Sequence, residues 1–196
     1  WDVVQMLARE GLFTLALPAE CGGVGIGVMN ICIVREELSR VSGHADNIFA
    51  MQGLGSYPIC LAGTHEQKST YLPPVARGER VAAFALTEPE AGSDVSGMLT
   101  TATLEGDEYV LNGMKRFISN AGDAQNYVVF AKTDPSAGNK GISAFIVERG
   151  TPGFTFGPKM KLLAPHPIGE LLFHDCRVPR ANLLDKPGEG FKISMK

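Results

Sequence analysis

The sequence has little of several features that would tie a protein to one environment or partner. Its 18 basic and 21 acidic residues are scattered and give a formal net charge of -3, without the basic stripe that nucleic acid demands. The longest apolar stretches, at residues 81–86 and 127–131, are far shorter than the roughly 20 residues needed to cross a bilayer. We therefore expect neither a nucleic-acid partner nor a membrane span.

Cysteine and histidine are also scarce, with four of each in 196 residues. The cysteines lie far apart without a C-x-x-C pair, so we expect reduced, mostly buried thiols. No two histidines have the helical spacing of metal ligands, and His174 with Cys176 lacks further ligands nearby, so we expect no metal site. A starting Met and a signal peptide are absent as well, and we expect that the chain begins within a longer protein.

Helical periodicity runs through the first 80 residues. A short apolar stripe ends at Gly11, and residues 28–41 repeat apolar positions at helical spacing. Residues 47–62 form a third, glycine-rich apolar segment, in which Pro58 predicts a kink or break. Thr64 is followed three residues later by Gln67, the capping-box pattern of a fourth helix. Two consecutive prolines predict that this helix ends near residue 76.

From residue 81 the apolar period changes to alternation between turn residues, which predicts strands. Gly106 and Asp107 predict a turn, and the Asn112-Gly113 pair is a strong signal for a second tight turn. The even spacing is typical of an antiparallel barrel or sandwich. The expected strands span residues 81–86, 101–105, 109–111, 127–131, 142–147 and 171–174.

These patterns predict an α+β chain in three parts. Residues 1–80 form a helical domain, and residues 81–180 form a β-barrel or sandwich. Residues 181–196 form a linker and, from residues 188–191 on, the start of a further helical domain that would lie beyond the chain.

The segment Phe84-Ala85-Leu86-Thr87-Glu88-Pro89-Glu90-Ala91-Gly92-Ser93-Asp94 carries the most chemical information. From its chemistry alone it is either an ordinary loop or a cradle for a phosphate or a polar ring edge, because it offers backbone N–H groups and two hydroxyls. Its T-E-P-x-A-G-S-D pattern, however, resembles a signature of the acyl-CoA dehydrogenase family. One hairpin downstream, Lys115-Arg116-Phe117-Ile118-Ser119-Asn120-Ala121-Gly122 is similar to the K-x-x-I-[T/S]-N-[A/G] segment of the same family.

Weaker similarities to this family extend along essentially all 196 residues. The resemblance implies an N-terminal helical domain, a β domain that binds FAD, and a second helical domain beyond Lys196. The further matching segments lie at residues 17–25, 36–40, 141–147, 151–153, 173–179 and 188–191.

The resemblance also implies a flavin site. Thr87 matches a hydroxyl at the pyrimidine end of the ring, Ser119 matches a Thr or Ser beside N5, and Phe117 matches a shielding residue that is usually Trp. Ser93 is also expected to meet the CoA substrate. The full set of expected FAD-binding residues is Phe84, Leu86, Thr87, Ser93, Phe117, Ile118 and Ser119.

The implied reaction removes a proton from the α-carbon of an acyl-CoA while hydride leaves the β-carbon for flavin N5, which yields a trans-2-enoyl-CoA. The family's catalytic base is a glutamate of the C-terminal domain, so no catalytic residue is assigned here and this chain alone is expected to be inactive. Glu88 and Glu90 match no base position. The expected partners are the acyl-CoA substrate, electron-transferring flavoprotein as acceptor and further copies of the chain in a homotetramer. The compartment stays open between a bacterial cytoplasm and a mitochondrial matrix.

Three departures from the family pattern stand out. Glu90 replaces a small residue in the first motif, residues 160–168 lack the usual Gly and Arg, and Phe117 replaces Trp.

Three alternative functions stay open from the sequence. Residues 22–27 resemble the phosphate loop of a nicotinamide-binding domain, but Val28 breaks the glycine spacing and no βαβ repeat surrounds it. A flavin monooxygenase or nitroalkane oxidase of the same fold differs mainly beyond Lys196. A non-catalytic relative would keep the fold without flavin.

Overall fold

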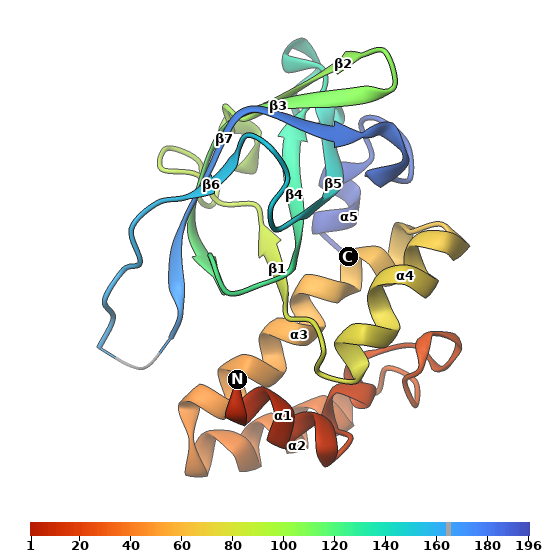
Figure 1. Ribbon diagram of the computed structural model, residues 1–196, viewed down its shortest axis with the longest axis vertical. Coiled ribbons are helices and arrows are strands. Elements are labelled where there is room, and N and C mark those ends of the chain that lie inside the picture. Colours follow the sequence, from red (N-terminus) through yellow and green to blue (C-terminus); the bar gives the residue numbers. More distant parts are fainter. Residues whose placement is uncertain (164–165) are drawn as a thin grey trace.

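The first four helices occupy one end of the molecule and the strands the other, with the short last helix beside the strands, in the computed structural model, which describes residues 1–163 and 166–196 (Figure 1). The α+β class predicted from the sequence is confirmed. The helices are α1 (Asp2–Arg9), α2 (Val28–Val41), α3 (Gly43–Ala62), α4 (His65–Ala76) and α5 (Gly190–Ser194), with short 3₁₀ turns at Leu12–Ala16, Ala19–Cys21, Val95–Gly97, Pro135–Gly141 and Arg180–Asn182.

Local sequence signals account for where the helices begin and end. The Ser42 hydroxyl accepts a hydrogen bond from the Ala45 N–H at the start of α3, and Thr64 with Gln67 forms the predicted capping box of α4. Helix α4 ends at Ala76 as expected. Of the kink or break predicted at Pro58, the break is wrong, because α3 continues to Ala62, and the kink stays a prediction. Proline removes one backbone hydrogen bond, and here the packing of the helix against the sheet maintains the helical conformation.

The helical half rests on the sheet through α3. A Cβ on Gly55 would lie 2.7 Å from the carbonyl carbon of Ala82, so the helix backbone touches the first strand directly. Helix α2 has no fully buried residue, although Ile31, Val34 and Leu38 pack partly against the core.

The strands are β1 (Ala82–Ala85), β2 (Thr101–Glu105), β3 (Glu108–Ser119), β4 (Asn126–Lys132), β5 (Ile142–Glu148), β6 (Phe154–Phe156), β7 (Ile168–Pro179) and β8 (Leu183–Leu184). They form one mixed sheet in the order β6-β7-β3-β2-β4-β5-β8, with β1 paired to β4. Most pairings are antiparallel as predicted, but β1 and β2 each run parallel to β4, and the hydrogen-bonded path stays open rather than closing into a barrel. Parallel neighbours cannot be joined by a tight hairpin, and the chain between β1 and β4 is long enough to cross over, because it carries β2 and β3.

The tight turn predicted at Asn112-Gly113 is wrong. Both residues lie inside β3, at an irregularity in its pairing with β7, and the hairpin turns instead at Gly106 and Asp107. Gly113 has a φ of 145°, and a Cβ there would meet Thr100. Glycine is therefore needed here for a bulge and a close approach, rather than for a turn.

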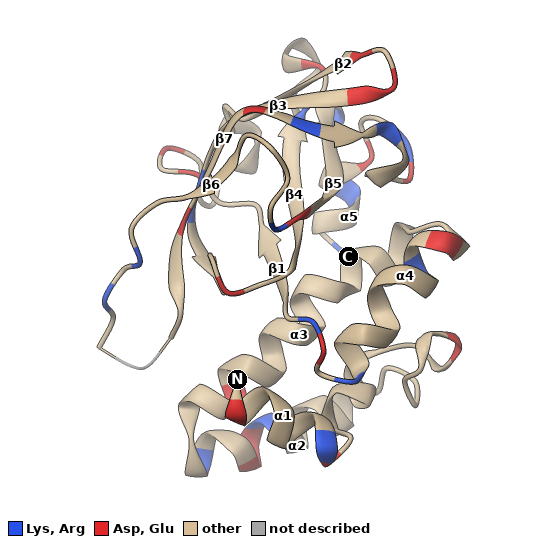
Figure 2. Ribbon diagram, in the orientation of Figure 1, with Lys and Arg blue, Asp and Glu red and all other residues tan. Residues whose placement is uncertain are grey.

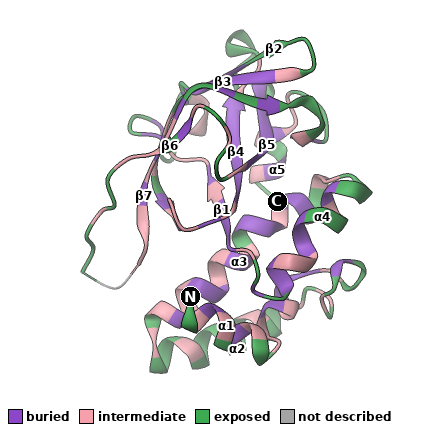
Figure 3. Ribbon diagram, in the orientation of Figure 1, coloured by how far each residue is buried: buried purple, intermediate pink, exposed green. Residues whose placement is uncertain are grey.

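Charged residues and buried residues lie on different parts of the chain. Figure 2 shows charged residues on the outer helices and near turns, whereas β1 carries none. Strands β4 and β5 are buried along nearly their whole length (Figure 3). All four cysteines are free thiols, and three are buried as expected, whereas Cys32 on α2 is exposed. Within the described part of the chain, no helix is long and apolar enough to span a bilayer.

An aromatic cluster fills the space between β4, β6 and β7. The rings of Phe154 and Phe173 stack with centroids 5.0 Å apart, and Tyr127 meets Phe154 edge-on at 5.0 Å. The cluster packs β6 and β7 against β4. The change from helix to strand falls between α4 and β1, and a domain boundary at residue 80 remains a prediction.

Candidate functional site

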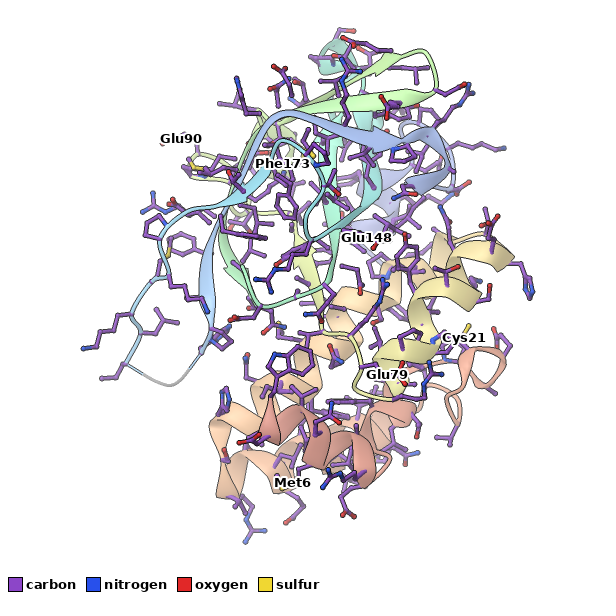
Figure 4. The ribbon with its side chains drawn as sticks, viewed as in Figure 1. Met6, Cys21, Glu79, Glu90, Glu148 and Phe173 are labelled. Atoms are coloured by element: carbon purple, nitrogen blue, oxygen red, sulfur yellow. The ribbon has the colours of Figure 1, made fainter. Side chains whose placement is uncertain are left out.

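The segment that follows β1 makes a tight turn at Pro89 and Glu90. Glu88 and Ala91 pair with each other across this turn, and Glu88 is only 4% exposed. Thr87 is half-buried and Ser93 is exposed. Glu90 is exposed too, and Figure 4 shows it at the outer edge of the sheet, so its charge points away from the core.

A buried ion pair joins this segment to β3. The Lys115 ammonium lies 2.7 Å from Oε1 of Glu88, with side chains 0% and 4% exposed, and it also donates to the Leu86 carbonyl at 3.1 Å. The Glu88 carboxylate accepts further hydrogen bonds from the backbone N–H groups of Leu99 at 2.6 Å and Thr100 at 3.1 Å. Every charge in this arrangement thus has polar partners.

The environment shifts the pKa values of both partners. Burial alone would raise the pKa of Glu88, but Lys115 and the Leu99 N–H together hold it below its ordinary value. Burial lowers the pKa of Lys115 to about 8, and the Glu88 carboxylate opposes that fall. At neutral pH we therefore treat the two groups as an ion pair, which leaves Glu88 without the raised pKa of a general base.

Backbone hydrogen bonds hold the same two segments together. The Arg116 N–H donates to the Thr87 carbonyl at 2.9 Å. Further along β3, the Asn120 side chain donates to the Ala82 carbonyl at 3.1 Å. The end of β3 therefore runs alongside β1 and the segment after it, and this brings both sequence motifs together.

Phe117 lies on a strained stretch of backbone. Its φ is 58°, in the left-handed region that a bulky residue rarely adopts, and the register of β3 against β7 shifts between Lys115 and Ile118. The ring is 54% exposed and lies under the Arg116 guanidinium, 5.2 Å from its carbon. A half-exposed aromatic on strained backbone is characteristic of a functional position.

The two residues after Phe117 differ in accessibility. Ile118 is 2% exposed, and its side chain belongs to the core, so only its backbone is available to a ligand. Ser119 is half-buried, and its hydroxyl lies 2.7 Å from Nε2 of His166. Burial and the nearby His44 lower the pKa of His166, which favours its neutral form.

Phe84 and Leu86 lie on the face of the sheet that packs against α3 and α4. Both are half-buried, and the Phe84 ring lies 4.9 Å from that of Phe130. Much of each side chain is therefore already in contact with the protein, while the remainder is accessible.

An apolar cavity of about 320 Å³ lies among α2, α3 and the turn at Leu12–Ala16. Ala50 and Gly53 contribute to its wall, where small side chains leave room, together with Leu54 and Tyr57. Gly55, a third small residue of this helix, instead provides the contact with β1. No cluster of three potential metal-ligating His, Cys, Asp or Glu side chains occurs among the residues that the structure describes.

Comparison with known proteins shows which family the chain belongs to. A model described as the acyl-CoA dehydrogenase N-terminal domain matches residues 1–79, and one described as the acyl-CoA dehydrogenase middle domain matches residues 83–176. The chain belongs to the acyl-CoA dehydrogenase family. Two sequence motifs on separate segments, held side by side in the fold, had already indicated it.

Curated relatives match the chain along its length. An acyl-CoA dehydrogenase of Bacillus subtilis (strain 168) is 42% identical over 198 residues, covering 100% of this chain and 52% of the relative. An acryloyl-CoA reductase (NADH) of Anaerotignum propionicum is 46% identical, covering 98% and 50%. A short-chain specific acyl-CoA dehydrogenase of Clostridium acetobutylicum is 44% identical, covering 98% and 52%. The chain thus spans about half the length of these relatives.

Several solved structures are closely similar to this chain. Butyryl-CoA dehydrogenase from Megasphaera elsdenii has a TM-score of 0.92 at 40% identity, over 98% of this chain and 52% of that one. A chain in a structure of the electron transferring flavoprotein of Acidaminococcus fermentans has a TM-score of 0.94 at 46% identity, over 98% and 51%. An acyl-CoA dehydrogenase from Bacillus anthracis complexed with FAD has a TM-score of 0.89 at 38% identity, over 98% and 33%.

Sequence reasoning missed two features of this site. It assigned no role to Glu88 or Lys115. The structure buries this acid and this base, one from each motif, as an ion pair. Sequence reasoning also left His166 without a partner, and the structure brings it to Ser119. The only sequence signal for the ion pair is that each residue lies inside a motif that resembles the family pattern.

Proposed function

We propose that this chain is the substrate-binding and FAD-binding part of an acyl-CoA dehydrogenase that desaturates an acyl-CoA to its trans-2-enoyl-CoA. The observation that carries the proposal is the junction of the two motifs, where Thr87 and Phe117 to Ser119 lie on segments joined by direct hydrogen bonds. The family membership and the names of the relatives support the same reaction.

The residues present suit a flavin. A flavin needs an apolar surface for its ring and hydrogen-bond donors along its polar edge. The half-exposed Phe117 ring offers the first, and the hydroxyls of the exposed Ser93 and of the half-buried Thr87 and Ser119 offer the second. A Cβ on Gly92 would meet nothing within 4 Å, so there is open space in front of this loop. Phe84, Leu86 and the Ile118 backbone complete the proposed set.

When bound, FAD would accept the hydride that leaves the β-carbon of the acyl chain. The task of Thr87 is to bind the pyrimidine edge of the ring, and that of Ser119 is to donate a hydrogen bond beside N5, where it stabilises negative charge. Phe117 excludes water from the ring, and Ser93 binds both cofactor and CoA. The α-proton needs a base of raised pKa, and Glu88 is not that base, because it is paired with Lys115 and its pKa is lowered.

The apolar cavity beside α3 is proposed to take the acyl chain. Its lining is almost wholly apolar, and Ala50 and Gly53 provide space for methylene groups. We propose electron-transferring flavoprotein as acceptor, supported by the similar chain within the structure of that protein from Acidaminococcus fermentans. We also propose that the protein forms a homotetramer and that a domain boundary lies near residue 80.

An anaerobic absorbance titration of the FAD-loaded, full-length protein with acyl-CoAs of varied length and branching tests the reaction. Bleaching of the flavin band by one class of acyl-CoA supports dehydrogenation and names the substrate. The relative named as an acryloyl-CoA reductase calls for the reverse assay too, in which an enoyl-CoA re-oxidises the reduced protein. Absence of bleaching by every acyl-CoA would favour a monooxygenase, a nitroalkane oxidase or a non-catalytic relative.

The assignment of site residues has its own test. Thr87→Val with Ser119→Ala removes two hydrogen bonds worth about 1 kcal/mol each, so FAD affinity or the rate of flavin reduction should fall by roughly tenfold or more. The control is Thr103→Val on β2, an exposed position outside the proposed site. Unchanged affinity and rate in the double variant would refute the site.

A further inference from the structure

The ion pair of Glu88 and Lys115 has no task in the proposed chemistry. Neither side chain can reach a ligand, because Lys115 is 0% and Glu88 4% exposed. The pair nevertheless lies where the segment after β1 meets β3, between the two groups of residues proposed to bind flavin. Its effect on a ligand must therefore be exerted through the backbone.

The Lys115 ammonium controls the backbone on both sides of Thr87. It donates to the Leu86 carbonyl at 3.1 Å and pairs with the Glu88 carboxylate at 2.7 Å, so the residues before and after Thr87 are held by one group. The Arg116 N–H then binds the Thr87 carbonyl itself at 2.9 Å. The position of the Thr87 hydroxyl is consequently set from β3.

Lys115 also stands at the start of the bulge that carries Phe117. The register of β3 against β7 shifts after Lys115, and Phe117 adopts its left-handed backbone two residues later. On the other side, the Glu88 carboxylate binds the backbone N–H groups of Leu99 and Thr100, which anchors the far end of the loop. One buried pair thus connects the Thr87 loop, the Phe117 bulge and the segment before β2.

General energetics favours a geometric role for such a pair. Desolvating two charges costs about as much as their attraction returns, so a well-packed apolar pair of similar volume often stabilises a fold equally well. A charged pair with three backbone partners differs in that it accepts only one arrangement of the groups around it.

We propose that Glu88 and Lys115 are positioning residues, which fix Thr87 relative to Phe117 and Ser119 so that one flavin ring contacts both segments. This inference rests on the proposed function, since it concerns the flavin site named there. Its distinguishing consequence is that FAD binding depends on the pair even where stability does not.

The test compares three variants of the full-length protein. Lys115→Met alone leaves the buried carboxylate of Glu88 without its cation, and this variant is expected to unfold at a lower temperature. Lys115→Met with Glu88→Gln removes both charges and keeps both shapes, and its unfolding temperature should recover towards that of the wild type. The matched control is Arg177→Met with Glu105→Gln, an exposed pair at 3.1 Å with side chains 50% and 52% exposed.

The readouts are the FAD dissociation constant, measured by fluorescence quenching, and the visible circular dichroism of the bound flavin. In the charge-free double variant we expect the dissociation constant to rise at least tenfold and the flavin dichroism to change, whereas the control double variant should match the wild type. Lys115→Leu with Glu88→Gln serves as a second charge-free variant where the first double substitution does not fold, with the same tenfold expectation.

The outcomes separate the two proposals. A wild-type protein that does not bind FAD would refute the proposed function. A wild type that binds FAD, with a folded charge-free double variant that binds it equally well and with the same dichroism, would refute the positioning role alone.

Discussion

The backbone of α3 at Gly55 lies against the backbone of β1 at Ala82, so closely that a Cβ on Gly55 would be 2.7 Å from the Ala82 carbonyl carbon and 2.7 Å from the Ala83 nitrogen. This contact joins the helical half of the chain to the strand that leads into the Thr87 loop. It also makes one glycine of α3 far more sensitive to substitution than its neighbour two residues earlier.

Gly55→Ala is expected to lower the free energy of unfolding by about 1–3 kcal/mol, because helix and strand must move apart. Gly53→Ala is the matched control, since its Cβ would meet only the Ala16 methyl group at 3.3 Å. Its helix-propensity gain of about 0.5–1 kcal/mol should offset that contact. Urea unfolding measures the free energy of unfolding of both variants, and an equal decrease in the two would contradict the described packing.

Gly53→Ala carries a second expectation, because Gly53 lines the apolar cavity. A methyl group there should shift activity of the full-length enzyme towards shorter acyl chains. The ratio of kcat/KM between two chain lengths measures this shift, and an unchanged ratio would count against the cavity as the acyl site.

Phe117→Gly should leave stability within about 1 kcal/mol of the wild type while weakening FAD binding. Glycine relieves a left-handed backbone that costs a side-chain-bearing residue about 1–2 kcal/mol, which offsets the loss of a ring already 54% exposed. Phe130→Ala, at a fully buried ring, should instead cost about 3–5 kcal/mol. Thermal unfolding and an FAD titration distinguish the two, and a large stability loss from Phe117→Gly would show that its ring is structural.

Acid should remove the stabilising contribution of Glu88. Its pKa is lowered in the folded state, so the contribution is present above the ordinary glutamate pKa of about 4.3 and is lost as pH falls through the folded value. Glu88→Gln should therefore flatten the dependence of stability on pH below about 4.5. Parallel unfolding curves for both proteins between pH 3 and pH 6 make the comparison, and identical slopes would contradict the lowered pKa.

Thr64→Ala should cost about 1 kcal/mol, because it removes the hydroxyl that accepts from the Gln67 N–H at the start of α4. Ser69→Ala is the control, since that exposed hydroxyl only bonds back to the Glu66 carbonyl within the same helix. The free energies of unfolding of the two variants, measured with denaturant, should differ by about the 1 kcal/mol that an N-cap hydrogen bond contributes. Equal free energies would argue against the capping box.

Local patterns determined much of this protein. The change from helical periodicity to alternation marked where strands begin, the Thr64 and Gln67 pair marked the start of α4, and both motifs indicated the family. These features depend on residues close together in the chain, whose conformational preferences and hydrogen bonds act before any distant contact forms.

The tertiary structure decided what local preference could not. Asn112-Gly113 favours a turn, yet pairing with β2 and β7 keeps it in a strand, and packing on the sheet keeps α3 continuous through Pro58. The meeting of Glu88 with Lys115, 27 residues apart, requires both segments to fold onto each other. Only the assembled core can bury that pair and hold Phe117 in a strained conformation, because many distant contacts together outweigh the preference of any one residue.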